Sequence, residues 1–285
     1  MYLARPDGAE IYYEVTGSGP AVIFAHGLGG NHISWWRQVP HFAAHYQCVT
    51  FAHRGFAPSR SSAAAGDSGP DLFTGDLAAL IDHLQLADVR LVAQSMGGWS
   101  CLEYALLHPE RVKALVMADT GGAADLATLD AAAREPIERW IAAHAGALED
   151  LFRRAIHPAA GERMAREQPA LHFLYREIDR LSDALDKNAL RAKLMETRQL
   201  PVSRLREIQA PVLFVCGEED VVFPPPAAAA LAACIPGAKV AFVPAAGHSV
   251  YFERPERFNE LVSAFLAAAD LTRNEVDARA GRTLQ

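Results

Sequence analysis

Short, uninterrupted apolar segments are the feature of this sequence that most constrains its fold. Residues 21–25 read A-V-I-F-A, and residues 47–52, 90–93 and 114–118 have a similar character. A strand without a polar face has to be covered on both sides, as it is in a parallel sheet between two layers of helices. These segments therefore predict an α/β fold with a doubly wound, mostly parallel sheet.

Helical patterns separate these segments and continue the alternation. Apolar residues recur at helical spacing over residues 72–84 and 96–107, and the apolar segments 211–216 and 239–243 each precede a further helical pattern. Strands that alternate with helices are typical of a sheet wound on both faces. We expect an N-terminal hairpin, turning at residues 6–8, at one edge of this sheet.

The alternation stops near residue 122 and resumes near residue 210. The intervening segment is rich in Ala, Glu and Arg, with candidate helices near residues 127–145, 148–156 and 171–181. An insertion of this kind is expected to lie over the carboxyl edge of the sheet, where open α/β sheets bind ligands. An independent helical domain is the alternative.

The chain therefore divides into three expected regions. They are an α/β core of residues 1–121 and 210–270, a helical cap of residues 122–209 inserted after the sixth strand, and a polar tail of residues 271–285.

Composition and charge exclude several classes of function. With 285 residues, 51% of them apolar, the chain can bury the core of one large domain. The net charge of −7 and the absence of a Lys/Arg cluster argue against a nucleic-acid partner. Because there is neither a signal-like N-terminus nor a run of about 18 apolar residues, we expect a cytoplasmic protein without a membrane partner. A small-molecule substrate is expected, and the oligomeric state, monomer or homodimer, stays open.

Four cysteines occur, none of them in a C-x-x-C pair. This spacing indicates neither a zinc site nor a redox dithiol, so we expect buried free thiols. The sequence predicts no metal and no cofactor.

The best-defined functional motif follows the strand at residues 89–93. The chain runs from this strand into A-Q-S-M-G-G at residues 93–98 and then into a helix. A serine on such a sharp turn exposes its hydroxyl above the sheet, near free N–H groups of the helix. The turn needs small residues two positions before and after the serine, and Ala93 and Gly97 meet this need. Ser95 is therefore a candidate nucleophile, with a purely structural serine as the alternative.

This turn resembles the nucleophile elbow of the α/β-hydrolase fold family, whose usual motif is G-x-S-x-G. Ala93 replaces the first glycine, which is the mildest change available. Further motifs similar to those of the family follow in the expected order, and the resemblance extends from residue 1 to about residue 269. It implies a serine hydrolase.

A serine hydroxyl needs a base to accept its proton. Of the 11 histidines, His248 is best placed, because it follows the last apolar strand and should lie at the same sheet edge as Ser95. It also matches the family's terminal G-H motif. Histidines that compete in principle are His26, His32, His53 and His157, although the resemblance gives His26 a structural role in the oxyanion loop.

The base in turn needs a carboxylate that fixes its tautomer. Residues 217–224 read G-E-E-D-V-V-F-P and resemble the family's G-x-x-D-x-x-x-P loop, which makes Asp220 the orienting acid. Asp119, at the end of another strand, occupies a position that some relatives use for this acid. It is the alternative.

The resemblance also implies two backbone donors that form an oxyanion hole. They are the N–H groups of Met96, directly after the nucleophile, and of Leu28, within H-G-L-G-G at residues 26–30. Several apolar residues near these motifs are candidates for the substrate pocket, although each is of a type found more often in cores. They are Trp35, Trp99, Trp140, Val222 and Val250.

The nucleophile narrows the range of reactions. Dehalogenases and epoxide hydrolases of this fold use an aspartate at the elbow, so Ser95 argues against both. The H-G-L-G-G loop and the Q-S-M-G-G elbow most resemble those of small esterases and enol-lactonases. We predict hydrolysis of a small carboxylic ester or lactone through an acyl-enzyme on Ser95. The alternatives are a C–C bond hydrolase of aromatic ring-cleavage products and a non-catalytic small-molecule receptor.

Overall fold

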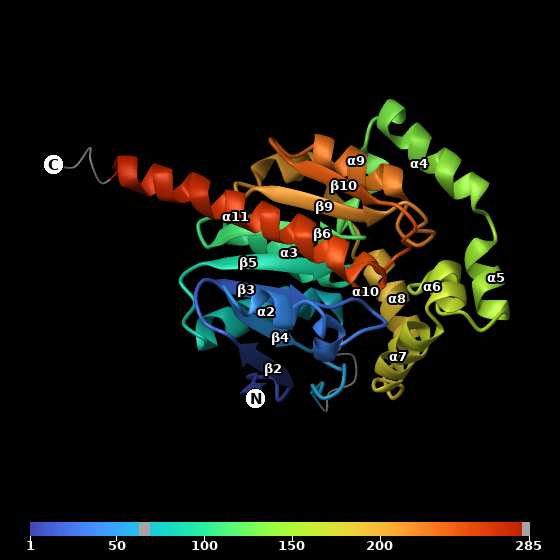
Figure 1. Cartoon of the computed structure of the whole chain (residues 1–285), viewed down its shortest axis with the longest axis horizontal. Coiled ribbons are helices and arrows are strands. Elements are labelled where there is room, and N and C mark those ends of the chain that lie inside the picture. The colour runs from blue at the N-terminus through green and yellow to red at the C-terminus, as the bar shows by residue number, and fades with distance from the viewer. Residues whose placement is uncertain (63–68, 281–285) are drawn as a thin grey trace.

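The computed structural model describes the backbone of residues 1–62 and 69–280, and side chains as far as Leu271. One eight-stranded sheet crosses the molecule in the order β1-β2-β4-β3-β5-β6-β9-β10 (Figure 1). β2 pairs antiparallel with β1 and β4, and the other neighbours are parallel, which confirms the predicted α/β fold and the edge hairpin. The strands are β1 (Tyr2–Ala4), β2 (Glu10–Thr16), β3 (Ala21–Ala25), β4 (Gln47–Phe51), β5 (Val89–Gln94), β6 (Val112–Ala118), β9 (Val212–Gly217) and β10 (Lys239–Val243).

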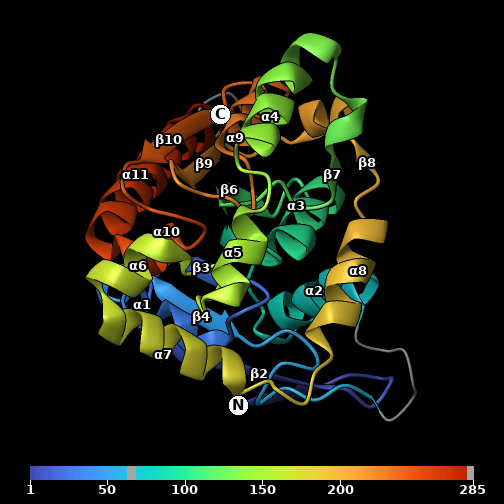
Figure 2. The same ribbon diagram turned by 90° about the vertical axis from the view of Figure 1, so that its right-hand side faces the viewer.

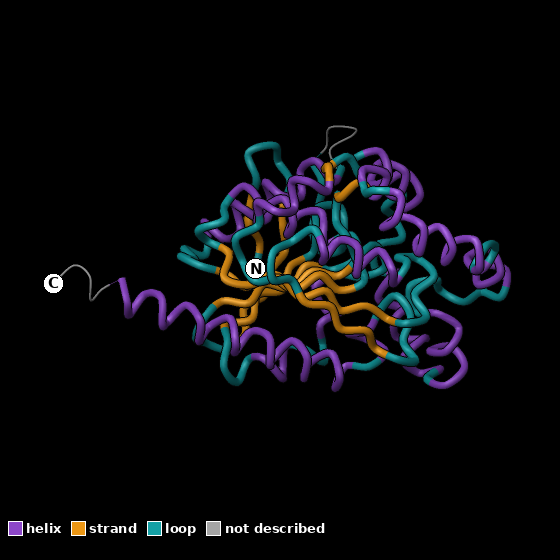
Figure 3. The backbone as a smooth tube through the Cα atoms, turned by 90° about the horizontal axis from the view of Figure 1, so that it is seen from above, coloured by secondary structure: helices purple, strands orange, loops and turns teal. Residues whose placement is uncertain are grey.

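Helices cover both faces of the sheet (Figure 3). Successive residues of a strand point to opposite faces, and the central strands β3 and β5 are buried at every residue, so both faces need a covering layer. Val22 and Phe24 pack in one buried cluster with α11, whereas Ile23 packs in the other with α2 and α3. The face of Val22 is covered by α1 (Val39–Phe42) and α11 (Pro255–Ala280), and the face of Ile23 by α2 (Phe73–His83), α3 (Gly97–Leu107) and α9 (Pro225–Ala233).

The winding direction of the chain changes between β3 and β5. The chain passes from β3 to β4 on one side and from β5 to β6 on the other, although β3 and β5 are neighbours in the sheet. The carboxyl end of such a switch point is where open α/β sheets bind ligands. The loops that begin there carry residues 26–30 and Ser95.

The segment between β6 and β9 is largely helical. Its helices lie beyond the carboxyl ends of the central strands (Figures 1 and 2). The chain leaves and returns through a two-stranded parallel sheet, β7 (Ala124–Asp125) with β8 (Leu200–Pro201). The helices are α4 (Ala131–Ala143), α5 (Ala147–Arg153), α6 (Gly161–Glu167), α7 (Pro169–Arg180) and α8 (Lys187–Glu196).

The tail expected from residue 271 begins as a helix. α11 continues as a helix to Ala280 and projects past the sheet in Figure 1. The segment after residue 271 contains alanine, arginine and glutamate, which favour helix even without an apolar stripe. Residues 281–285 of that expected tail lie outside the described residues.

The cysteines are free thiols, as predicted. Cys48, Cys101 and Cys216 are buried, whereas Cys234 is only half-buried. Within residues 1–62 and 69–280, no helix combines the length and apolar character that a membrane crossing would need.

Gly97 offers a test of the packing beneath the elbow. A Cβ at this position would lie 2.3 Å from the carbonyl oxygen of Ala25 in β3, so Gly97→Ala should lower the free energy of unfolding by about 1–3 kcal/mol. Denaturant unfolding measures this change. Gly75→Ala, at a helical glycine in α2 with open space around it, is the matched control and should be neutral or stabilising. Equal losses in the two variants would contradict the assigned close packing.

Candidate active site

Ser95 lies on the sharp turn between β5 and α3. Its φ is +48°, in the left-handed region that non-glycine residues rarely adopt, and its N–H donates to the carbonyl oxygen of Ala118 at 3.0 Å. A Cβ on Gly27 would lie 3.0 Å from the Cβ of Ser95, so the loop after β3 passes directly beside the serine. The elbow and this loop thus form adjacent walls of one site.

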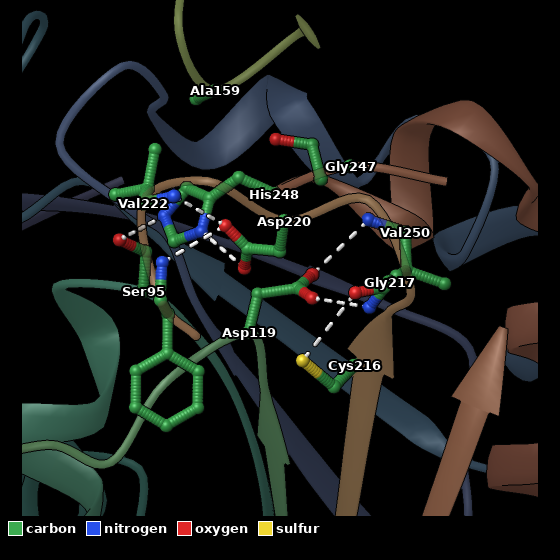
Figure 4. Close-up of polar contacts among 12 residues, drawn as sticks. Ser95, Asp119, Ala159, Cys216, Gly217, Asp220, Val222, Gly247, His248 and Val250 are labelled. Atoms are coloured by element: carbon green, nitrogen blue, oxygen red, sulfur yellow. Dashed lines mark hydrogen bonds and ion pairs between the residues drawn. The ribbon is translucent and has the colours of Figure 1, made fainter. Parts of the chain in front are cut away.

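Three side chains from separate strand ends meet at this turn (Figure 4). Nε2 of His248, after β10, lies 2.8 Å from Oγ of Ser95, and its Nδ1 lies 2.8 Å from Oδ2 of Asp220, after β9. An ionised carboxylate only accepts hydrogen bonds, so Nδ1 carries the ring proton and Nε2 accepts from the serine hydroxyl. This arrangement can move the hydroxyl proton to the imidazole while the serine attacks an electrophile.

Asp220 is held for this contact by its own loop. Its side chain is fully buried, and its Oδ1 accepts the N–H groups of Val222 and Phe223 at 2.8 and 2.9 Å. Hydrogen bonds to one oxygen leave the other free to face His248. Asp220 is thus fixed in orientation and keeps its acceptor for the ring.

The alternative acid, Asp119, is engaged elsewhere. Its Oδ1 accepts the N–H of Gly217 at 2.9 Å and its Oδ2 accepts the N–H of Val250 at 3.1 Å. These bonds join the ends of β6 and β9 to the loop of His248 (Figure 4). The structure therefore places Asp220, and not Asp119, against the imidazole.

The buried charges around His248 favour its protonated form. Burial alone would lower the pKa of His248, but the charge and hydrogen bond of Asp220 outweigh burial and raise that pKa above 6.5. Burial and the nearby charge of Asp220 raise the pKa of Asp119 well above 3.8. Proton transfer from Ser95 would thus create an imidazolium where the surroundings stabilise it.

Sequence reasoning gave no role to two residues that hold the His248 loop. Nε2 of Gln94 donates to the carbonyl oxygen of His248 at 2.8 Å, and the carboxylate of Glu253 accepts the N–H of Gly247 at 3.0 Å. Gln94 directly precedes the nucleophile, and Glu253 is the one charged residue of the otherwise apolar α10 (Val250–Glu253). Their positions in the sequence, next to the nucleophile and in an apolar segment, could have drawn attention to these two residues.

Both predicted oxyanion donors have free N–H groups. Among the described residues, neither the N–H of Leu28 nor that of Met96 donates a hydrogen bond. Nδ1 of the buried His26 donates to the carbonyl oxygen of Gly27, and burial lowers the pKa of this histidine to about 3, which keeps it neutral. His26 thus shapes the loop beside Ser95, as the resemblance implied.

The other histidines considered as bases have partners other than Ser95. Nε2 of His26 accepts the N–H of His53, which is fully buried, and His157 lies against Gly29 of the same loop. His32 packs edge-on against Tyr12. Among the histidines of the described chain, His248 alone hydrogen-bonds to Ser95.

The candidate pocket residues have different positions. Two lie at the site: Val222 is 41% exposed beside His248 (Figure 4), and the indole of Trp140 donates to the carbonyl oxygen of Asp220 at 3.2 Å. Trp140 and His248 line a cavity of about 310 Å³. Trp99 packs with Met96 in a small apolar cluster, and its indole donates to Thr197 at 3.2 Å.

Two pocket assignments were wrong. Trp35 is 0% exposed and packs against Phe24 and Tyr251, because the turn at residues 32–35 directs it into the core and leaves Trp36 outside. Val250 is also fully buried. It is the first residue of α10, and its N–H is bonded to Asp119.

One group of potential metal ligands exists among the described residues. Ligand atoms of Asp119, Cys216 and Asp220 lie within 4.8 Å of one another. The carboxylates already bind backbone N–H groups and His248, and burial raises the pKa of the Cys216 thiol well above its usual 9.0, which disfavours the thiolate ligand. The two carboxylates therefore serve to hold the His248 loop, and the three residues are poorly suited to bind a metal ion.

The assignment of the acid can be tested by the reactivity of Ser95. Asp220→Asn should slow covalent labelling of Ser95 by a fluorophosphonate roughly 10³–10⁴-fold, because the imidazole loses the partner that fixes its tautomer. Asp119→Asn serves as the matched carboxylate variant and should slow labelling much less. Mass spectrometry of the labelled peptide measures both rates; a larger loss in Asp119→Asn would move the assignment to Asp119.

Known proteins are similar to this chain over nearly its whole length. The chain is 31% identical to a Mycobacterium tuberculosis protein named "Putative non-heme bromoperoxidase BpoC". The 271 aligned residues cover 90% of this chain and 97% of that protein. It is 30% identical over 280 residues to the 2-hydroxy-6-oxononadienedioate/2-hydroxy-6-oxononatrienedioate hydrolase of Burkholderia vietnamiensis, covering 91% and 92%. The enol-lactonase structure from Burkholderia xenovorans LB400 superimposes with a TM-score of 0.74 at 21% identity, over 94% of this chain and 100% of that one. Residues 20–255 match the family model described as "alpha/beta hydrolase fold", and the chain belongs to this family.

Proposed function

We propose that the protein is a serine hydrolase that cleaves small carboxylic esters or lactones through an acyl-enzyme on Ser95. The observation that carries this proposal is the hydrogen-bonded series from Ser95 through His248 to Asp220, with 2.8 Å at each step. Such a series activates a hydroxyl at neutral pH, and membership of a hydrolase family supports its use for hydrolysis.

The reaction begins with attack of Ser95 Oγ on the substrate carbonyl carbon. His248 Nε2 takes the hydroxyl proton, and the N–H groups of Leu28 and Met96 bind the negative oxygen of the tetrahedral intermediate. When the intermediate collapses, His248 returns the proton to the leaving alkoxide. A water molecule, deprotonated by the same imidazole, then attacks the acyl carbon, and His248 returns this proton to Ser95 Oγ as the carboxylic acid leaves. In a lactone the leaving oxygen stays attached to the acyl chain.

The cavity beside His248 suits a small substrate. Its volume of about 310 Å³ falls at the lower end of the range for small-molecule sites. Trp140, Leu151 and Val221 supply apolar wall beside charged side chains, and His248 borders the cavity, whereas Ser95 is not one of its lining residues. We expect this cavity to hold the leaving-group side of the substrate.

C–C bond hydrolysis is the second candidate. It is favoured by the 30% identity to the Burkholderia vietnamiensis hydrolase over 91% of this chain. That reaction must deliver a proton to a carbon leaving group, whereas ester cleavage delivers it to oxygen. A panel of short esters, lactones and ring-cleavage dienones at one pH distinguishes the two, because a dienone turned over far faster than every ester would make C–C cleavage the function.

The acyl-enzyme is tested by burst kinetics. A short-chain p-nitrophenyl ester should release p-nitrophenol in a burst of about one equivalent per active site, and Ser95→Ala should abolish the burst and lower kcat by about 10⁶-fold. Stopped-flow absorbance measures the burst. Tight binding of small molecules without turnover of any panel substrate would instead indicate a receptor.

Activity should fall on acidification, because only the neutral imidazole accepts a proton. Since the pKa of His248 is raised, the acid limb of kcat/KM should have its midpoint above pH 6.5. Initial rates at subsaturating ester across the acidic and neutral range measure it. A rate that stays flat from about pH 5 to 8 would contradict His248 as the base.

A further inference from the structure

The loop that carries His248 is held mainly by buried side chains from other elements. Gln94 binds the carbonyl oxygen of His248, and Asp119 binds the N–H of Val250. Glu253 holds the two residues that flank the histidine: its carboxylate accepts the N–H of Gly247 at 3.0 Å and that of Ser249 at 3.3 Å. The backbone on both sides of the imidazole is therefore anchored to one carboxylate.

Glu253 is a buried charge without a cationic side-chain partner. Its side chain is 2% exposed, and no ion pair to it exists among the described residues. Burial raises the pKa of Glu253 to about 7, although the N–H groups of Gly247 and Ser249 favour its charged form. Burying a carboxylate here costs free energy, and an uncharged side chain that accepts the same backbone N–H groups would avoid that cost.

The charged groups near Glu253 come from four parts of the chain. Arg254 follows it in sequence and favours its ionised form, whereas Asp220 opposes it. Burial raises the pKa of Tyr175 from α7, and the charge of Glu253 adds to this rise, as it adds to the effect of Asp220 on the pKa of His248. Glu253 thus acts electrostatically on the base from behind, in addition to its hydrogen bonds.

We propose that Glu253 is a positioning residue for the hydrolytic reaction, which fixes the loop of His248 through Gly247 and Ser249 and, in its ionised form, supplies a second negative charge to the imidazolium. This inference rests on the proposed function of the Ser95–His248–Asp220 site.

The two contributions have separable physical consequences. Anchoring keeps Nε2 of His248 within 2.8 Å of Ser95, and a small displacement of such a base lowers the chemical rate strongly. The charge stabilises imidazolium, which raises the pH at which the base becomes protonated. A purely structural Glu253 would change only the stability of the fold.

Two substitutions separate these contributions. Glu253→Gln keeps the size and removes the charge, whereas Glu253→Asp keeps the charge and shortens the reach to Gly247 and Ser249. Glu260→Gln is the matched control, because Glu260 lies on an exposed face of α11 and, among the described residues, pairs with Arg257 alone. Thermal melts verify folding before kinetics.

Glu253→Gln should lower kcat for a short ester about 10- to 100-fold with KM nearly unchanged, and should shift the acid limb of kcat/KM to lower pH by about 0.5–1 unit. Glu253→Asp should lower kcat but keep the acid limb of the wild type. Glu260→Gln should change neither. If Glu253→Gln does not fold, Glu253→Asp still tests the anchoring, and a kcat equal to that of the wild type would refute it.

NMR titration of the His248 ring protons, which needs no substrate, gives a second readout. The titration midpoint should fall in Glu253→Gln and stay in Glu253→Asp. A wild type without ester turnover would refute the proposed function, while this titration would still test Glu253. The role of Glu253 is refuted if Glu253→Gln lowers the melting temperature yet keeps the wild-type kcat, acid limb and imidazole midpoint.

Discussion

The parallel alignment of β3, β5, β6, β9 and β10 is the constraint on which the site depends. Residues that are distant in sequence meet because all five strands end at the same edge of the sheet. Ser95, Asp220 and His248 each follow one of these strands within a few residues. The close packing of Gly97 against β3 then fixes the height of the elbow, so that one imidazole can reach both partners.

The fold and the position of Ser95 on a sharp turn could be predicted because their signals are local. Strands without a polar face require two covering layers, and the small residues around Ser95 are demanded by the turn itself. The choice of Asp220 over Asp119 rested on resemblance alone, because both carboxylates follow strands of the same edge. In the structure the difference lies in backbone N–H groups, which occupy both oxygens of Asp119 and only one oxygen of Asp220.

Other features depended on contacts that a linear pattern does not contain. Trp35 and Trp36 are adjacent residues of the same type, and the turn at residues 32–35 decides which of them enters the core. Helices α6 and α8 were not predicted individually, since α6 is short and α8 has only Leu190 and Leu194 as buried residues. The roles of Gln94 and Glu253 emerge only once the loop of His248 lies between them.

The way the helical segment is joined to the sheet has a consequence for the diversity of such proteins. The N–H of Leu200 donates to the carbonyl oxygen of Ala123 at 3.0 Å, so the two ends of the insertion lie side by side. The residues between them form an insertion whose two ends meet, so its length can change while the strands and their loops stay in register. Substrate choice can thus diverge by transplanting one module over an unchanged set of reacting groups.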